Sequence, residues 1–256
     1  MKLKDRVVLI TDAASPLGVE IASRLGEEGA ILVLNAYPEQ GFNPSGYGLL
    51  THADPESKAS IDGAVQAILD KYGRIDVVVH NNNEVIPSTL EDCTDDVYDR
   101  AININVKSAF LYVQAVGPAM KAAKSGNFVF VSSIHDEKPL GGAFTYSIAK
   151  GALKMLAKEM VLDMGPCNIR TNIVNMGPVK GDEKRFYSDL SPLYERTAER
   201  IVNHQFGSLS DVANAVLLFA GNDCVSANGS ELKLDGGFLL TYFLPTKGNK
   251  PTEEQQ

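Results

Sequence analysis

Apolar residues along this chain fall into seven short runs, separated by longer segments with a helical repeat. The runs have strand length, are rich in valine, isoleucine and leucine, and lie at 6–11, 30–35, 48–52, 75–80, 127–132, 169–175 and 230–234. The helical segments lie at 17–28, 58–72, 95–124, 145–164 and 210–220. Apolar strands that alternate with helices predict a parallel sheet with helices packed on both of its faces.

Nothing in the sequence divides this pattern into separate domains. No linker rich in proline or serine, no block of like charge and no internal repeat interrupts residues 1–245. Residues 246–256 read TKGNKPTEEQQ, a polar composition typical of a disordered end. We therefore expect a single α/β domain at 1–245, built on a doubly wound parallel sheet of the Rossmann type, and a polar C-terminal tail.

Charge and composition exclude several classes of partner. The net charge of −8 argues against nucleic acid and anionic membranes, which need a basic surface. The chain has neither the features of a signal peptide nor a stretch near the roughly 18 apolar residues of a membrane span. Cys93, Cys167 and Cys224 have no metal-ligand spacing and form no even disulfide set. We expect a cytoplasmic protein without a metal site.

The residues that follow the strands carry the candidate chemistry, because ligands of doubly wound sheets bind beyond the carboxyl ends of the strands. Ser133 directly follows the fifth run, and the helical segment TYSIAK then contains Tyr146 and Lys150. Residues four apart share one face of a helix, so the phenol and the ammonium point toward the same side. The spacing alone leaves open that the two are a surface pair.

The chain resembles the short-chain dehydrogenase/reductase family from about residue 5 to residue 237. The pieces that carry the resemblance occur in the family's order and spacing: the first strand and turn, Asp54 in HADPES, HNNN at 80–83, NINV at 103–106, VSS at 131–133, YSIAK at 146–150, IVNMGPV at 173–179 and SANGSELKLDGG at 226–237. The resemblance implies an NAD(P)-dependent oxidoreductase that interconverts a small alcohol and its carbonyl compound.

The same resemblance assigns four catalytic roles. Tyr146 is the proton donor or acceptor, and Lys150 lowers the pKa of Tyr146 and holds the nicotinamide ribose. Ser133 hydrogen-bonds the substrate oxygen, and Asn105 anchors the water of a proton relay. Moving a phenol pKa from about 10 to about 7 requires roughly 4 kcal/mol. A lysine about 4 Å away, at an effective dielectric constant near 20, supplies about that much.

The phosphate-binding turn departs from the family's pattern T-G-x-x-x-G-x-G. Here the turn reads TDAASPLG, so Asp12 and Pro16 replace the first two glycines and Gly18 is kept. We expect Ser15 to cap the following helix and Pro16 to occupy its first position. Leu17 and Gly18 then offer backbone N–H groups to the pyrophosphate. Asp12, about 8 Å from a phosphate, would cost roughly 2 kcal/mol of binding.

Residues at the ends of the second to sixth runs complete the expected cofactor site. Asn35 stands where NAD-binding relatives commonly carry an acid, and it can hydrogen-bond a ribose. Asn81 matches a family asparagine, while Gly177 and Val179 offer backbone contacts to the carboxamide. Asp54 fits the adenine amine, although a turn or helix-cap role explains it equally well.

The choice between the two dinucleotides follows from charge. NADP-binding relatives usually place a basic residue at a position that is Ala36 or Ser15 in this chain. With no cation for a 2′-phosphate and with Asp12 adding negative charge, we expect NAD(H) to be preferred over NADP(H).

The substrate and the assembly are less defined. Residues 180–206 lie where the family keeps its substrate lid, unless they form a solvated helix pair. The stretch SSIHDEKP after the fifth run resembles the corresponding part of bacterial glucose dehydrogenases of the family, so His135 and an acid beside the reacting carbonyl would suit a polyol or sugar, unless that histidine is incidental. Relatives are usually dimers or tetramers, so we expect a homodimer or homotetramer with helices 95–124 and 145–164 at an interface. The apolar stretch 238–245 would be buried by a neighbouring subunit or by its own pocket.

A second hypothesis treats the chain as a non-catalytic relative, a binding or assembly protein with a weakened cofactor site. Four departures from the family pattern motivate it: Asp12, Pro16, Asn83 in place of a glycine, and Gly181 in place of a threonine. The intact set of catalytic residues favours the enzyme.

Overall fold

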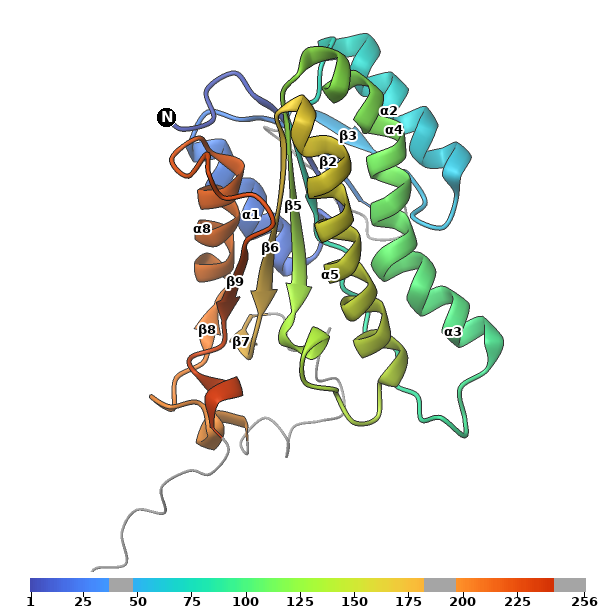
Figure 1. The fold of residues 1–256 in the computed structure, drawn as a ribbon, viewed down its shortest axis with the longest axis vertical. Coiled ribbons are helices and arrows are strands. Elements are labelled where there is room, and N and C mark those ends of the chain that lie inside the picture. Colours follow the sequence, from blue (N-terminus) through green and yellow to red (C-terminus); the bar gives the residue numbers. More distant parts are fainter. Residues whose placement is uncertain (37–47, 182–196, 242–256) are drawn as a thin grey trace, which may run out of the picture.

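The computed structural model describes residues 1–36, 48–181 and 197–241. Its centre is a seven-stranded sheet in which all neighbouring strands are parallel, in the order β3-β2-β1-β4-β5-β6-β9 (Figure 1). The strands are β1 (Val7–Ile10), β2 (Ile31–Asn35), β3 (Leu49–Thr51), β4 (Val77–His80), β5 (Gly126–Ser133), β6 (Ile169–Met176) and β9 (Glu231–Leu234). Each coincides with one of the seven apolar runs, so the predicted fold class is confirmed.

Helices cover both faces of the sheet (Figure 1). Helices α1 (Pro16–Glu27) and α8 (Leu209–Ala220) lie on one face, and α2 (Lys58–Tyr72), α4 (Ser108–Ala123) and α5 (Phe144–Met164) lie on the other. In the described ranges, three 3₁₀ turns follow strands or helices: η3 (Ile134–Asp136), η4 (Gly165–Cys167) and η5 (Phe238–Leu240). Two short strands, β7 (Val179–Lys180) and β8 (Gly207–Ser208), pair beside the main sheet. They were not predicted, since two residues carry no periodic signal.

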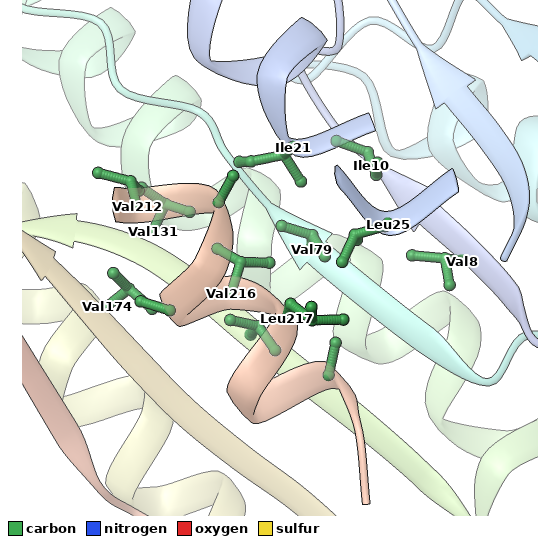
Figure 2. Close-up of a cluster of buried hydrophobic side chains, with 14 of the residues drawn as sticks. Val8, Ile10, Ile21, Leu25, Val79, Val131, Val174, Val212, Val216 and Leu217 are labelled. Carbon is green, nitrogen blue, oxygen red and sulfur yellow. The ribbon is translucent and has the colours of Figure 1, made fainter. Parts of the chain in front are cut away.

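Alternation along each strand divides the core into two layers. Val8 and Ile10 of β1 pack toward α1 and α8, where Val79, Val131 and other strand residues meet those helices (Figure 2). Val7 and Leu9 point to the opposite layer, against α2 and α4. Burying one such side chain completely contributes about 1.5–3 kcal/mol. The two layers together hold the carboxyl ends of the strands in fixed positions, and the site is built on these ends.

The helix predicted over 95–124 contains a π-helical turn in its middle part, which the periodicity did not indicate. Helix α3 (Asp95–Ile102) is followed by a π-helical turn, η2 (Asn103–Lys107), before α4 begins. The amide nitrogen of Asn105 donates to the carbonyl oxygen of Ala101 at 3.0 Å and to that of Glu84 at 2.9 Å. This side chain ties the turn to the loop after β4. Such π turns occur frequently at functional sites.

The order of the strands reverses at β1. The chain proceeds from β1 to β2 and β3 on one side, then crosses to β4, β5 and β6 on the other. Ligands of doubly wound sheets bind in the crevice beyond the carboxyl ends of strands at such a reversal. The crevice here lies between the loops that follow β1 and β4.

The predicted tail at 246–256 and residues 182–196 of the expected lid lie outside the described residues. Within the described ranges, every helix is too short or too polar to cross a lipid bilayer.

Candidate active site

Tyr146 and Lys150 lie on one face of α5, as their spacing predicts. Tyr146 is 1% exposed and Lys150 is fully buried. The Lys150 ammonium nitrogen lies 5.3 Å from the centre of the Tyr146 ring and donates to the carbonyl oxygen of Asn82 at 3.0 Å. A buried ammonium needs such fixed polar partners to offset its lost hydration. The loop after β4 therefore holds Lys150 beneath the phenol.

Ser133 ends β5 and faces the same space. Its side-chain oxygen accepts from the backbone N–H of His135 at 3.3 Å and so caps η3. The His135 ring meets the Tyr146 ring edge-on at 6.2 Å, and burial lowers the pKa of His135. Its Nδ1 donates to the carbonyl oxygen of Lys138 at 2.8 Å, which leaves Nε2 as an acceptor.

A cavity of about 330 Å³ joins these groups. Ser133, His135 and Tyr146 line it, together with the backbone at Gly177 and Val179 that was predicted to contact the carboxamide. A side chain at Gly177 would come within 2.6 Å of the Asp235 backbone, so this segment lies directly against the end of β9. The structure thus places the Tyr146 phenol, the Ser133 hydroxyl and residues 177–179, which were expected to contact the cofactor, around one cavity.

Asn105 reaches this region from the π turn. Its side chain is fully buried, and η2 packs against α5. The amide nitrogen is used by Ala101 and Glu84, whereas Oδ1 has no hydrogen-bond donor within the described part of the chain. An acceptor without a donor is costly to bury, which marks this atom as available to a further hydrogen bond.

His80 is a site residue that the sequence analysis missed. It ends β4, is fully buried, and hydrogen-bonds through Nε2 to the Ser108 hydroxyl at 2.7 Å. That hydroxyl donates to the carbonyl oxygen of Ile104 at 2.6 Å, so Nε2 carries the proton. Burial, with a smaller effect of the Lys150 charge, lowers the pKa of His80 from 6.5 to about 3. A neutral His80 thus joins β4 to the π turn.

We expect His80 to make the protein less stable as the pH falls from about 6.5 toward 3. The unfolded chain takes up a proton at His80 below pH 6.5, whereas the native state does not, so the free energy of unfolding drops by about 2 kcal/mol between pH 7.5 and pH 5. Urea unfolding at both pH values measures this drop. His80→Gln keeps a donor toward Ser108 without titrating, and it should remove that part of the loss. The same loss in both proteins would contradict the assignment.

The turn TDAASPLG keeps the shape that glycines usually provide. Asp12 adopts a positive φ of 48°, a region that aspartate tolerates better than most residues. Ser15 caps α1 as predicted, with Pro16 at its first position. The Ser15 hydroxyl accepts from the N–H of Gly18 at 3.1 Å, so this N–H is already bonded within the turn. Leu17 is the other predicted donor, and its N–H has no acceptor within the described ranges.

Gly18 allows the turn to lie directly on the helix. A methyl group there would lie 2.4 Å from the Asp12 carbonyl oxygen and 2.7–2.8 Å from backbone atoms of Ala13. Real Cβ atoms do not approach backbone this closely. The glycine is therefore required by packing inside the turn.

Asparagines after β4 fasten the turn to the sheet. The Asn81 backbone N–H donates to the Thr11 hydroxyl at 2.9 Å, and the Asn81 amide donates to Ser15 Oγ at 3.1 Å. Asn83, which stands in place of a family glycine, is fully buried and donates to the carbonyl oxygen of Val131 at 3.3 Å. Its side chain is directed into the protein, toward β5.

Asn35 and Asp54, which were predicted to bind the adenosine part of the dinucleotide, make hydrogen bonds to other groups of the protein. The Asn35 amide donates to the carbonyl oxygen of Ala53 at 3.0 Å, and its oxygen accepts from Ala53 N–H at 2.7 Å and from the Thr51 hydroxyl at 2.8 Å. Asn35 thus holds β3, and its contact with a ribose stays a prediction. Asp54 is exposed and accepts from the N–H of Glu56 at 2.9 Å, a turn role that leaves its second oxygen for the predicted adenine contact.

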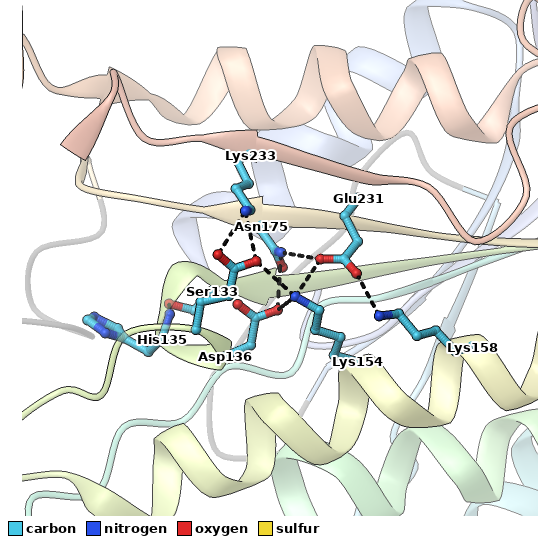
Figure 3. A network of polar contacts seen from close by, with 9 residues as sticks. Ser133, His135, Asp136, Lys154, Lys158, Asn175, Glu231 and Lys233 are labelled. Atoms are coloured by element: carbon cyan, nitrogen blue, oxygen red, sulfur yellow. Dashed lines mark hydrogen bonds and ion pairs between the residues drawn. The ribbon is translucent and has the colours of Figure 1, made fainter. Parts of the chain in front are cut away.

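Charged residues hold η3, the 3₁₀ turn after Ser133, against α5 and β9 (Figure 3). Lys154, one helical turn beyond Lys150, contacts Asp136 at 3.3 Å, Glu137 at 2.9 Å and Glu231 at 2.7 Å. Burial alone would lower the pKa of Lys154, but these three carboxylates raise it. Burial raises the pKa of Asp136. Asp136 and Glu137 of SSIHDEKP therefore face Lys154, and the contact of an acid with a polyol stays a prediction.

Known proteins are similar to this chain over most of their length. Residues 13–239 match the family model described as enoyl-(acyl carrier protein) reductase. The chain is 29% identical to cyclopentanol dehydrogenase of Comamonas sp. (strain NCIMB 9872), over 93% of this chain and 98% of that protein. It is 30% identical to (2S)-[(R)-hydroxy(phenyl)methyl]succinyl-CoA dehydrogenase subunit BbsD of Thauera aromatica, over 94% and 99% of the two chains.

A solved structure shows the same fold. The crystal structure of levodione reductase superposes with a TM-score of 0.86 at 25% identity, and the match covers 94% of this chain and 100% of that one. The region matched by the family model contains the four predicted catalytic residues: Asn105, Ser133, Tyr146 and Lys150.

Proposed function

Because the chain belongs to the short-chain dehydrogenase/reductase family, and so to the NAD(P)-dependent oxidoreductases that act on CH–OH groups, we propose that it interconverts a small alcohol and its carbonyl compound in the cavity beside Tyr146. One observation carries the proposal. A fully buried lysine lies beneath a buried tyrosine that lines, together with Ser133, a cavity beyond the carboxyl ends of the strands.

The three cysteines are free thiols, which suits a reducing cytoplasm.

Tyr146 moves the proton in this proposal. In the oxidative direction its phenolate takes the proton of the substrate hydroxyl, and in the reductive direction its phenol returns that proton to the carbonyl oxygen. The Lys150 charge, 5.3 Å from the ring centre, stabilises the phenolate. Ser133 donates a hydrogen bond that orients and polarises the reacting oxygen. Hydride transfer is the chemistry that a dinucleotide held in the crevice would supply.

Asn105 extends the proton path from Lys150 in this proposal. Its buried Oδ1 has no donor among the described residues, and η2 packs on the helix that carries Tyr146 and Lys150. We assign Asn105 to the relay that connects the Lys150 ammonium to solvent. His80 and Ser108 support the turn from β4 and act as positioning residues.

The residues of the crevice fit a dinucleotide. The turn 11–15 lies tightly on α1 because Gly18 has no side chain, and Leu17 at the helix N-terminus has an N–H available to the pyrophosphate. Lys150 would hold the nicotinamide ribose, and Gly177 and Val179 the carboxamide.

We propose NAD(H) as the preferred form. A 2′-phosphate needs a cation near the end of β2, and the sequence contains no lysine or arginine between Arg24 and Lys58. Asp12 adds a carboxylate to the turn, which disfavours the extra phosphate charge further.

Calorimetric titration with NADH and with NADPH tests the cofactor assignment. We expect micromolar binding of NADH and weaker binding of NADPH. Asp12→Asn keeps a residue that tolerates positive φ and removes the charge, so it should tighten NADH binding up to about thirtyfold. Millimolar or absent binding of both dinucleotides would instead favour the non-catalytic binding or assembly protein.

We also propose a homodimer or homotetramer formed through α4 and α5. Large apolar side chains recur every seventh residue along the outer side of α5, at Ile148, Met155 and Leu162, with exposures of 44%, 56% and 74%, and Phe110 on α4 is 46% exposed. Burial of this stripe by a second copy would remove apolar surface from water. Sedimentation velocity measures the assembly, and a monomer at micromolar concentration would contradict it.

A further inference from the structure

The cavity beside Tyr146 is cationic in an acidic protein. The chain has a net charge of −8, yet no aspartate or glutamate of the described ranges lines the cavity, whereas Lys138 and Arg200 do. Lys138 lies in the loop after η3, and Arg200 lies in the segment before β8. Two segments distant in sequence therefore bring positive charge to the substrate side of the site.

Both cations lie on one aromatic ring. The Lys138 ammonium is 5.4 Å and the Arg200 guanidinium carbon 4.9 Å from the centre of the Phe238 ring. Phe238 is only 9% exposed and also lines the cavity, so it fixes where the two charges stand. Both positive charges therefore stand around the same ring of the cavity wall.

Neither cation is paired with a carboxylate within the described part of the chain, while lysines at the same end of the sheet are. Lys154 contacts Glu231 at 2.7 Å, and Lys233 contacts Glu137 at 2.7 Å. Arg200 is exposed and Lys138 is half-buried, so an incoming anion can reach both. A lysine and an arginine that both lie on one ring of the cavity wall are suited to bind one carboxylate through charge-assisted hydrogen bonds.

The remaining walls are mostly apolar, with Val85, Ile134, Leu140 and Met176 among the lining residues. The volume of about 330 Å³ lies near the lower limit of ligand pockets, and the backbone expected to contact the nicotinamide takes part of it. The space admits a short hydrocarbon body between the reacting carbon near Tyr146 and the two cations.

Resting on the proposed function, we infer that the substrate is a small hydroxy acid or its oxo acid, with a carboxylate bound by Arg200 and Lys138 and a hydrocarbon body against the apolar walls. Oxidation removes a hydride from the carbinol carbon and a proton from its hydroxyl. The carboxylate itself does not react.

Matched pairs of ketones test this inference. With the dinucleotide that binds, we would compare kcat/KM for the reduction of 4-oxocyclohexanecarboxylate and 4-oxopentanoate with the values for their neutral amides. We expect each acid to be favoured at least about tenfold, since a hydrogen bond to a charged group contributes about 1.5–3 kcal/mol. Arg200→Gln and Lys138→Gln should each reduce the ratio about tenfold and leave reduction of the amides unchanged.

Lys71→Gln is the matched control, because Lys71 also lies on an aromatic ring, that of Tyr72 at 5.1 Å, but on α2 and away from the cavity. The ratio should not change in this variant. If no ketone is reduced, calorimetry of the same pairs on the NADH-loaded protein provides the comparison. Equal affinity for acid and amide, or binding of neither, would overturn the inference.

The two failures are distinguishable. Tight binding of a dinucleotide without a preference for the acids leaves the oxidoreductase standing and overturns the anionic substrate. Absence of dinucleotide binding overturns the proposed function, and calorimetry of the acids and amides on the protein alone then decides the anion site separately.

Discussion

Tyr146→Phe should lower kcat by about three orders of magnitude and leave the dissociation constant of NADH unchanged. The substitution removes only the group that exchanges the proton, and general acid–base catalysis contributes about 10²–10⁴-fold. The ring stays, so its edge-on contact with His135 and its position near Lys150 are preserved. Steady-state kinetics and calorimetry on the same preparation measure the two quantities.

Tyr112→Phe is the control for that experiment. Tyr112 is also fully buried, lies on α4, and has a hydroxyl without a hydrogen-bond partner in the described ranges. Burial raises the pKa of Tyr112, so its hydroxyl stays protonated and takes no part in proton transfer. Removing it should leave kcat unchanged and stability equal or higher. A Tyr146→Phe enzyme that keeps more than a tenth of kcat would show that the proton follows another path.

Gly18→Ala should destabilise the native state by about 3 kcal/mol and weaken NADH binding. The added methyl group would lie 2.4 Å from the Asp12 carbonyl oxygen and within 2.8 Å of the Ala13 backbone, and backbone cannot move aside as a flexible side chain can. The turn must shift away from α1, and the N–H of Leu17 shifts with it. Urea unfolding and NADH titration measure both effects.

Gly63→Ala separates crowding from helix propensity. Gly63 lies inside α2, and nothing lies within 4 Å of a methyl group built there. Alanine is the better helix former, so this variant should gain up to about 1 kcal/mol. If Gly18→Ala were as stable as the parent, the contact between turn and helix would be looser than the structure shows.

The glycine-poor turn illustrates how different residues can produce the same backbone. Asp12 adopts the positive φ that a glycine would supply, and Ser15 with Pro16 begins α1 without the second glycine. Gly18 is the position without a substitute, because its constraint is space rather than conformation. We expect the cost of the altered turn to fall on phosphate affinity, through the Asp12 charge and the Gly18 N–H bonded to Ser15.

The sequence by itself determined the sheet, most helices and the pairing of Tyr146 with Lys150. These features depend on periods of two and 3.6 residues and on a spacing of four, which are properties of short segments. The cap at Ser15 was predictable for the same reason, since it involves neighbours along the chain.

Only the tertiary structure decided which groups face the cavity. Asn35 is turned to Ala53 and the acids after Ser133 to Lys154, because buried polar groups bond to whichever partners the packed sheet brings near them. The π turn at Asn105 depends in the same way on Glu84.

His80, Lys138 and Arg200 carry no local pattern that distinguishes them from other charged or polar residues. Their roles come from contacts with Ser108 and Phe238, which lie 28 to 100 positions away along the chain. Such contacts form only when strands and loops pack together, and for this reason the fold and the pairing of Tyr146 with Lys150 could be predicted from the chain, whereas the positions of Lys138 and Arg200 at the cavity could not.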